Sequence, residues 1–174
     1  MKDAKGGVIS VTAKYITVAV GGRPSFLTDI ANVEKLCITS DDIFSLKSTP
    51  GKILIVGASY IALECAGFLN AFGFDVTVMV RSIFLRGFDQ QCAERIATFM
   101  DNHGVKFIRD SVPSNIEATE DGKRKVTWTN SSSKTTYERV FDTVMLAVGR
   151  SADTKNLGVE EVGIETASSG KIIC

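Results

Sequence analysis

The sequence predicts an α/β fold in which a parallel sheet has an antiparallel meander as its last crossover. From Lys52 onward, short apolar segments alternate with helical segments, which is the pattern of parallel βαβ units. Between residues 111 and 140 the hydrophobic period changes from that of a helix to two, and turn signals separate the segments. The apolar segment 143–148 then returns the chain to the sheet. This arrangement is uncommon and therefore informative about the family.

Two strands and two helices are expected in the first part of this unit. Residues 52–56 and 74–80 are short, β-branched apolar segments, which favour buried parallel strands. Residues 60–72 place apolar side chains at helical spacing. Asp89 is placed to cap a second helix, which the sequence Asn102-His103-Gly104 ends.

A third parallel strand over residues 105–108 leads into the meander. The meander strands are separated by Asp121-Gly122 and by the serine-rich turn 130–133. A fourth parallel strand over 143–148 follows them and ends in Gly149-Arg150. The three expected meander strands cover residues 111–117, 123–130 and 134–140.

The two ends of the chain do not fit this unit. Strands are expected over residues 8–12 and 15–20, and residues 25–49 are expected to form a polar, irregular connector. Two strands alone are not stable as a domain, and glycines break up the last segment of the chain. We therefore expect one complete domain with pieces of something larger on either side, divided into residues 1–49, 50–150 and 151–174.

Composition argues against several classes of protein. The 174 residues include 20 basic and 20 acidic ones, so no overall charge favours a nucleic acid or an anionic membrane. No apolar run approaches the roughly 20 residues that span a bilayer, and no signal-like segment follows Met1. Cys37, Cys65, Cys92 and Cys174 lack the spacing of a metal or redox site, which favours free thiols in a reducing, cytosol-like setting.

The segment "ILIVGASYIALEC", residues 53–65, is similar to the strand-turn-helix that binds dinucleotides. Gly57, Ser59 and Ala62 occupy the three positions of G-x-G-x-x-G/A, so the pattern is G-x-S-x-x-A. The Ser59 hydroxyl and backbone N–H could donate to a phosphate at the positive end of the helix. The pattern is equally compatible with a strand-turn-helix that binds no nucleotide.

Arg81, Ser82 and Arg86 follow the second strand, where NAD sites and many S-adenosylmethionine sites place a carboxylate. Val80 stands in the place of that carboxylate. Two guanidinium groups and a hydroxyl suit a 2′-phosphate, which favours NADPH. The alternative is that both arginines are solvated loop residues.

Tyr60 and Glu64 lie four residues apart and share a face of the first helix. The tyrosine could cover a bound nicotinamide, and the carboxylate could contact a neighbouring basic group. On spacing alone, a half-buried packing tyrosine and a solvated glutamate are the favoured interpretation.

Several segments together resemble one family. "KILIVGASYIALECAGFLNAFGFDVTVMVRSIFLRGFDQ" (52–90) resembles the NADPH-binding domain of the large thioredoxin reductases and thioredoxin glutathione reductases. These are flavin-dependent pyridine nucleotide-disulfide oxidoreductases related to glutathione reductase. "YITVAVGGRP" and "TSDDIFSL" resemble the end of the family's first FAD-binding segment and its link, and "TVMLAVGR" resembles the strand that leaves the NADPH domain. The resemblance implies a Rossmann-like parallel sheet with an antiparallel meander crossover, plus short flanking strands from an FAD-binding domain.

The resemblance also implies roles for individual residues. Tyr60 would be a mobile ring over the flavin, and Glu64 would help to position the nicotinamide; neither is implied to be catalytic. Val20 stands where the family's A-T-G pattern has threonine. The pyrophosphate and ribose would lie against Gly57, Ala58, Ser59 and Ile61. The 2′-phosphate would be held by Arg81, Ser82 and Arg86. The nicotinamide half would pass near Ala147, Gly149 and Arg150, and FAD would contact Ala19, Gly21 and Ser40.

The implied activity belongs to a longer protein, in which hydride passes from NADPH to FAD and electrons pass on to thioredoxin, glutathione disulfide or both. The family's redox cysteine pair, FAD glycine motif, interface-domain His-Glu pair and C-terminal redox tail are absent from these 174 residues. We therefore expect this portion alone to bind cofactor without reducing disulfides. The full-length protein would be a homodimeric oxidoreductase in the cytoplasm, with a mitochondrial form as an alternative, and would act without nucleic acid or membrane.

Two other interpretations remain open from the sequence. The chain could be a free-standing NADP(H)-binding module or sensor without flavin, although its first 50 residues would then have to fold without the rest of an FAD domain. It could also be an unrelated enzyme such as a methyltransferase, against which the missing carboxylate and the meander both count.

Overall fold

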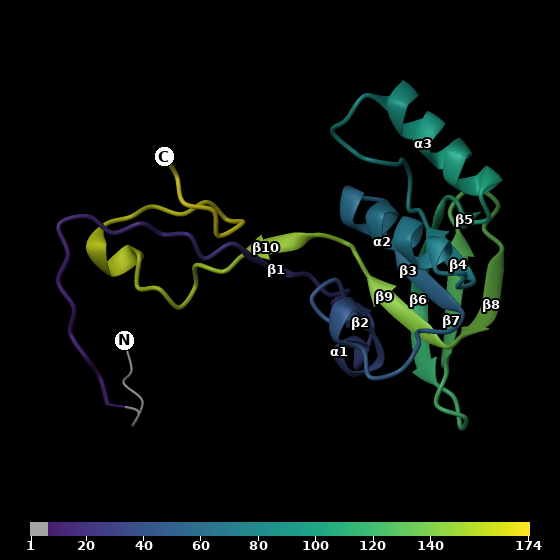
Figure 1. The fold of residues 1–174 in the computed structure, drawn as a ribbon, viewed down its shortest axis with the longest axis horizontal. Coiled ribbons are helices and arrows are strands. Elements are labelled where there is room, and N and C mark those ends of the chain that lie inside the picture. Colours follow the sequence, from purple (N-terminus) through teal and green to yellow (C-terminus); the bar gives the residue numbers. More distant parts are fainter. Residues whose placement is uncertain (1–6) are drawn as a thin grey trace. The chain divides into compact units, whose positions relative to one another are not determined.

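The computed structural model describes residues 7–174 (Figure 1). These residues fall into two compact units, of which the larger covers Arg23–Ser151. The smaller unit combines the described residues up to Gly22 with Ala152–Cys174. Within the described residues, none of the helices has the length and apolar character needed to cross a bilayer.

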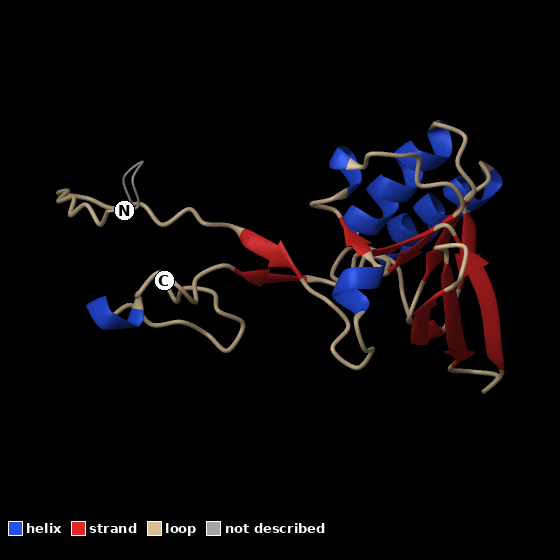
Figure 2. Cartoon of the chain, turned by 90° about the horizontal axis from the view of Figure 1, so that it is seen from below, coloured by secondary structure: helices blue, strands red, loops and turns tan. Residues whose placement is uncertain are grey.

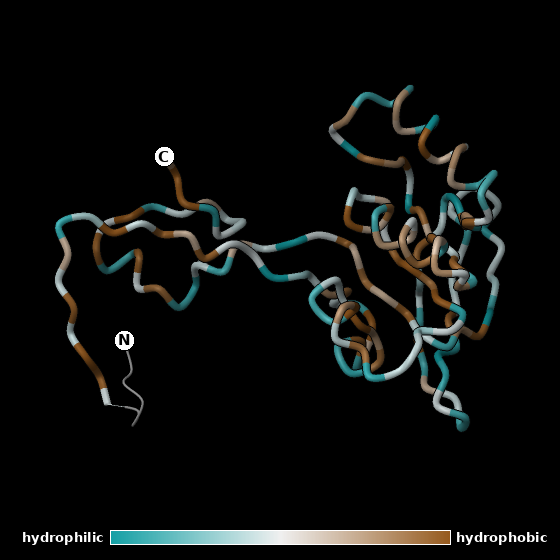
Figure 3. Tube along the Cα trace, viewed as in Figure 1, coloured by the Kyte–Doolittle hydropathy of each residue, from teal (hydrophilic) through white to brown (hydrophobic). Residues whose placement is uncertain are grey.

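A five-stranded parallel sheet forms the centre of the larger unit, with the strand order β2-β9-β3-β4-β5. Its central strands consist almost entirely of apolar residues and are coloured as hydrophobic in Figure 3. The expected parallel strands are therefore confirmed, with slightly shorter limits. The strands are β2 (Ile38–Thr39), β3 (Ile53–Val56), β4 (Val76–Met79), β5 (Lys106–Ile108) and β9 (Thr143–Leu146).

The two faces of this sheet are covered by different layers (Figures 1 and 2). Ile53 and Ile55 of β3 point into one core, which they share with the helices α2 (Tyr60–Ala71) and α3 (Gln90–Asn102). Leu54 and Val56 point into a second core on the meander side. Burial on both faces explains why β3 is continuously apolar rather than alternating.

The meander follows β5 as expected. Its strands pair antiparallel in the order β6-β7-β8, and Ile116, Val126 and Trp128 turn inward to the second core. The register shifts between Pro113 and Asn115, a bulge next to a residue that cannot donate a backbone hydrogen bond. The strands are β6 (Ser111–Ala118), β7 (Arg124–Asn130) and β8 (Thr136–Phe141).

Helix α3 begins and ends at the predicted signals, and α2 covers the residues expected of it except Phe72. Asp89 caps α3, because its Oδ1 accepts a hydrogen bond from the backbone N–H of Cys92 at 2.9 Å. The helix ends before Gly104, which has a left-handed φ of +102°. Ser59 is the N-cap residue of α2.

The sequence predicted an irregular connector over residues 25–49, and this prediction is wrong. This segment contains helix α1 (Val33–Leu36), strand β2 and the 3₁₀ helix η1 (Ile43–Ser45). Its strand pairs parallel with β9, with Ile38 opposite Met145. A two-residue strand is too short to produce a hydrophobic period, so only the tertiary pairing reveals it.

The strands expected over residues 8–12 and 15–20 are also wrong. The structure assigns a single bridge residue at Val8 and no strand over either segment. The smaller unit includes the 3₁₀ helix η2 (Glu160–Val162). Strands β1 (Gly22–Pro24) and β10 (Arg150–Ala152) form a two-stranded sheet. Apolar alternation shows that side chains suit a pleated surface, whereas a strand forms only where a paired backbone is present.

Replacing Thr77 with valine is expected to stabilise the protein. Thr77 lies in β4 with no exposed surface, and its Oγ1 is the one buried side-chain nitrogen or oxygen among the described residues that lacks a hydrogen-bond partner. Removing an unsatisfied buried hydroxyl should raise the free energy of unfolding by about 1 kcal/mol or more. Thermal or urea unfolding measures the change.

Thr143→Val is the matched control for this substitution. The Thr143 hydroxyl donates to the Pro50 carbonyl at 2.7 Å, so its removal should lower stability by about 1 kcal/mol. A Thr77→Val protein that unfolds more easily than wild type would contradict the interpretation of Thr77 as unsatisfied.

Candidate functional site

A cavity of about 420 Å³ opens at the carboxyl ends of β3, β4 and β9. Its lining includes residues of three sequence-distant segments: the turn 57–60, the loop after β4 with Arg81, Ser82 and Arg86, and the residues 147–149 after β9. In α/β sheets, ligands bind in this position because the loops that follow parallel strands meet at one edge. The cavity therefore brings together the glycine turn and the arginine loop, as the sequence predicted.

Gly57 is required by the packing of the turn. Its φ is +122°, and an added Cβ would lie 2.3 Å from the carbonyl oxygen of Ala147. Its backbone N–H donates to the Met79 carbonyl at 2.9 Å, which ties the turn to β4. The first glycine of the pattern thus permits β3 and the end of β9 to approach each other closely.

Ser59 and the first turn of α2 provide donors at the floor of the cavity. Ser59 has extended backbone angles, and its side chain makes no capping bond to the helix. The first backbone N–H groups of a helix have no partner within it, and the helix dipole adds positive potential there. Ala62, the third small residue of the pattern, is fully buried, so helix and sheet pack closely.

The loop after β4 presents two arginines and a serine to the same cavity. Arg81, Ser82 and Arg86 are exposed side chains that line it. The Arg86 guanidinium donates to the Ser82 hydroxyl at 2.8 Å, and the backbone N–H of Leu85 donates to the Ala58 carbonyl at 2.8 Å. The loop is therefore attached to the glycine turn and holds its polar groups together.

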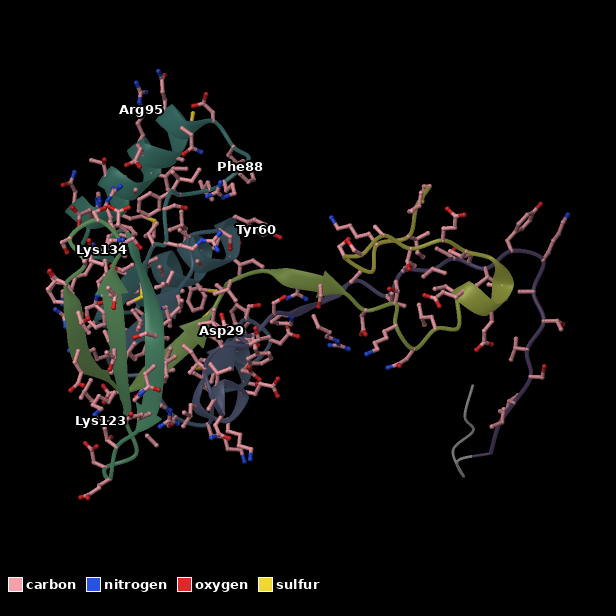
Figure 4. All side chains as sticks on the ribbon, turned by 180° about the vertical axis from the view of Figure 1, so that it is seen from behind. Asp29, Tyr60, Phe88, Arg95, Lys123 and Lys134 are labelled. Atoms are coloured by element: carbon pink, nitrogen blue, oxygen red, sulfur yellow. The ribbon has the colours of Figure 1, made fainter. Side chains whose placement is uncertain are left out.

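Tyr60 lies between this cavity and a second one. Tyr60 is 52% exposed and lines both, and Figure 4 shows it on the same side of the unit as Phe88. Glu64, one turn further along α2, is exposed and lines neither cavity. Tyr60 and Glu64 both lie on α2, as predicted, but only Tyr60 lines a cavity.

The second cavity has a volume of about 170 Å³ and contains the other predicted residues of the larger unit. The Arg150 guanidinium lies at its edge, 3.5 Å from the Ser40 hydroxyl and 3.3 Å from Asp41 Oδ1. Ala19 and Gly21 belong to the smaller unit. The predicted residues that line the second cavity are Ser40, Ser59, Tyr60, Ile61, Ala147, Gly149 and Arg150.

The larger cavity also has an apolar wall that was not predicted from the sequence. Phe88 lies after the arginine loop and is 59% exposed, while Val112 and Pro113 come from β6 and Leu27 from the segment before α1. Val112 and Pro113 follow a strand that ends at the same sheet edge, which is the one signal that could have indicated them. An apolar wall beside the arginine-bearing loop has the chemistry that suits a nucleotide base.

The two buried thiols do not have the character of nucleophiles. Burial raises the pKa of the Cys65 thiol, and the negative charge of Glu64 raises it further. Burial raises the pKa of Cys37 to about 12, against the opposing effect of Arg124. The four cysteines are free, as expected, and in residues 7–174 no cluster of three or more histidine, cysteine or acidic side chains could hold a metal.

The family model for pyridine nucleotide-disulphide oxidoreductases matches residues 1–174. The chain belongs to this family. The resemblance predicted from the sequence is therefore confirmed. Membership implies flavin and nicotinamide cofactors.

Two relatives in this family are thioredoxin reductases. The chain is 48% identical over 170 residues to thioredoxin reductase SEP1 of Emiliania huxleyi, which covers 98% of this chain and 34% of that protein. It is 47% identical over 165 residues to a thioredoxin reductase of Plasmodium falciparum (isolate FCH-5), covering 94% of this chain and 29% of that protein. The chain thus spans about a third of the length of these relatives.

A solved structure of the family has the same fold. The flavoprotein disulfide reductase RclA from Escherichia coli, induced by HOCl and solved as a Cu(II) complex, matches with a TM-score of 0.76 at 26% identity. The match covers 88% of this chain and 34% of that one. The predicted α/β fold with its meander is confirmed.

Proposed function

We propose that this chain is the NADPH-binding portion of a flavoprotein disulfide reductase, in which it presents the nicotinamide for hydride transfer to FAD. The observation that carries the proposal is the position of Arg81, Ser82 and Arg86. They lie on the rim of the cavity that also contains the Gly57 turn and the first turn of α2. One cavity thereby offers donors for a pyrophosphate and for a 2′-phosphate.

The residues present fit this cofactor. Gly57 leaves room for close backbone packing at the turn, and the Ser59 hydroxyl makes no capping bond to its own helix. The pyrophosphate would lie against Ser59 and the start of α2, and the adenine against the apolar wall that includes Phe88 and Val112. NADPH supplies the hydride when bound, while these side chains bind and orient it. Tyr60, at the junction of the two cavities, would cover the nicotinamide end.

The rest of the proposal concerns the longer protein. Residues 50–150 would hold NADPH, and residues 1–49 and 151–174 would belong to the FAD-binding domain, with Ala19, Gly21 and Ser40 near the flavin. The names of the two thioredoxin reductases support thioredoxin as the disulfide substrate. Glutathione disulfide, alone or beside thioredoxin, is the alternative that the sequence resemblance implies. We further propose a homodimer in the cytoplasm, or in mitochondria for a second form.

Calorimetric titration of the chain with NADPH and with NADH tests the proposal. Two charge-assisted hydrogen bonds to the 2′-phosphate should make the affinity for NADPH about a hundredfold higher than that for NADH. Equal affinities would reject the 2′-phosphate assignment. An absorbance scan of the same sample tests whether these residues retain flavin without the rest of the protein.

A further inference from the structure

The loop that holds the arginines has an unusual backbone conformation. Residues 80–89 connect β4 to α3, and Leu85 in their middle has a left-handed φ of +44°. A bulky residue with positive φ costs free energy and persists only where surrounding contacts hold it. Some part of the structure must therefore hold this loop.

Gln90 makes the contacts that hold it. Its Nε2 lies 3.0 Å from the Phe88 carbonyl oxygen, 3.3 Å from that of Phe84 and 3.4 Å from that of Leu85. Carbonyl oxygens only accept hydrogen bonds, so the amide nitrogen of Gln90 must face them and donate. One side chain thus joins three carbonyls on both sides of Arg86.

Gln90 is itself fixed to a rigid element. It is the first residue of α3, whose start is set by the Asp89 cap. Ala93 and Ala97 of this helix are fully buried against the sheet core. The Gln90 amide therefore links a surface loop to a well-packed helix.

The middle of the loop is also held by contacts that do not involve Gln90. Phe84 is fully buried and packs edge-on against Phe107 with ring centroids 5.0 Å apart. The backbone N–H of Leu85 is bound by the Ala58 carbonyl. The backbone N–H of Phe88 also donates to the Leu85 carbonyl at 2.9 Å. These contacts fix where the loop lies, whereas the Gln90 amide joins the carbonyls before and after Arg86, the residue that donates to Ser82.

We propose that Gln90 is a positioning residue that sets the selectivity for a 2′-phosphorylated nucleotide by holding the arginine loop in its binding conformation. This inference rests on the proposed function, because it assigns the loop's arginines to the 2′-phosphate. A loop held in place before binding loses less conformational entropy when the phosphate arrives. Without the Gln90 amide, the loop becomes ordered only on binding, and this loss of conformational entropy weakens the affinity.

The test compares Gln90→Met with Gln91→Met in the full 174-residue chain. The probes are adenosine 2′,5′-bisphosphate and 5′-AMP, which differ only in the 2′-phosphate. Gln90→Met should lower the affinity for the bisphosphate about tenfold and change that for 5′-AMP by less than about twofold. Gln91 is the exposed neighbour on the same helix, and its substitution should change neither.

Gln90→Asn guards against a simple folding defect. It keeps the amide but shortens the side chain by one methylene, so it should show the same selective loss while its thermal midpoint stays near that of wild type. The inference about Gln90 would be wrong, while the proposed function would stand, in either of two cases. The Gln90 variants could lose affinity equally for both probes, or both could keep the wild-type preference for the bisphosphate. A wild-type chain that binds both probes equally would overturn the proposed function and this inference with it.

Discussion

Replacing Arg81 and Arg86 together with alanine is expected to lower the affinity for NADPH about a hundredfold, with less than about a fivefold change for NADH. Both side chains line the larger cavity, and Arg86 is already held beside Ser82 by a 2.8 Å hydrogen bond. The selective loss follows because only NADPH carries the phosphate that these groups would bind. Calorimetric titration of the double variant with both nucleotides measures it.

The control for this prediction is Arg95→Ala combined with Arg139→Ala. Both arginines are exposed, and they lie on α3 and β8 outside the cavity lining, so the change in net charge is the same. The control should bind both nucleotides as wild type does. If it loses NADPH affinity as strongly as the Arg81/Arg86 variant, the effect is one of overall charge and the 2′-phosphate assignment is wrong.

Gly57→Ala is expected to lower the free energy of unfolding by about 2–5 kcal/mol and to abolish nucleotide binding. The new Cβ would lie 2.3 Å from the Ala147 carbonyl oxygen, and that oxygen belongs to backbone rather than to a flexible side chain. Strand β9 and the turn must therefore move apart, and alanine must also adopt a φ near +122°. The movement would displace Ser59 and the start of α2 from the cavity floor.

Gly67→Ala is the matched substitution in the helix that follows the same turn. Gly67 lies inside α2, and an added Cβ there meets no atom within 4 Å. Alanine should stabilise the helix by up to about 1 kcal/mol. Urea unfolding of both variants measures the contrast, and a Gly57→Ala protein as stable as wild type would show that the close approach of β9 is not required.

The meeting of the glycine turn and the arginine loop was predictable because each segment is local in the sequence. Gly57 and Ser59 follow one strand, Arg81 and Arg86 follow the next, and parallel strands end at one edge of a sheet. That rule alone places the two loops together without any knowledge of the tertiary structure. The helix start at Asp89 was predictable for the same reason, since capping depends on neighbouring residues.

The parts that sequence analysis missed depend on contacts between distant residues. Val112 and Pro113 line the cavity because β6 starts at the same edge, and Ile38 joins the sheet because it lies opposite Met145. Neither fact leaves a periodic signal in the sequence. The apolar alternation of residues 15–20 is the opposite case, in which a strand-like pattern is present but the structure assigns no strand.

The role of Gln90 belongs to this second group. A glutamine at the first position of a helix has no special pattern, and its three carbonyl partners become visible only when the left-handed backbone at Leu85 turns them toward it. Side chains that position a binding loop are therefore harder to predict than the charged groups that the loop carries.

A crystal structure of the chain with bound NADPH tests the central claim most directly. We expect the 2′-phosphate within hydrogen-bonding distance of Arg81, Ser82 and Arg86, the pyrophosphate at Ser59 and the nicotinamide end beside Tyr60. Density for the nucleotide outside this cavity, or in the reverse orientation with the nicotinamide at Arg81, would contradict the account.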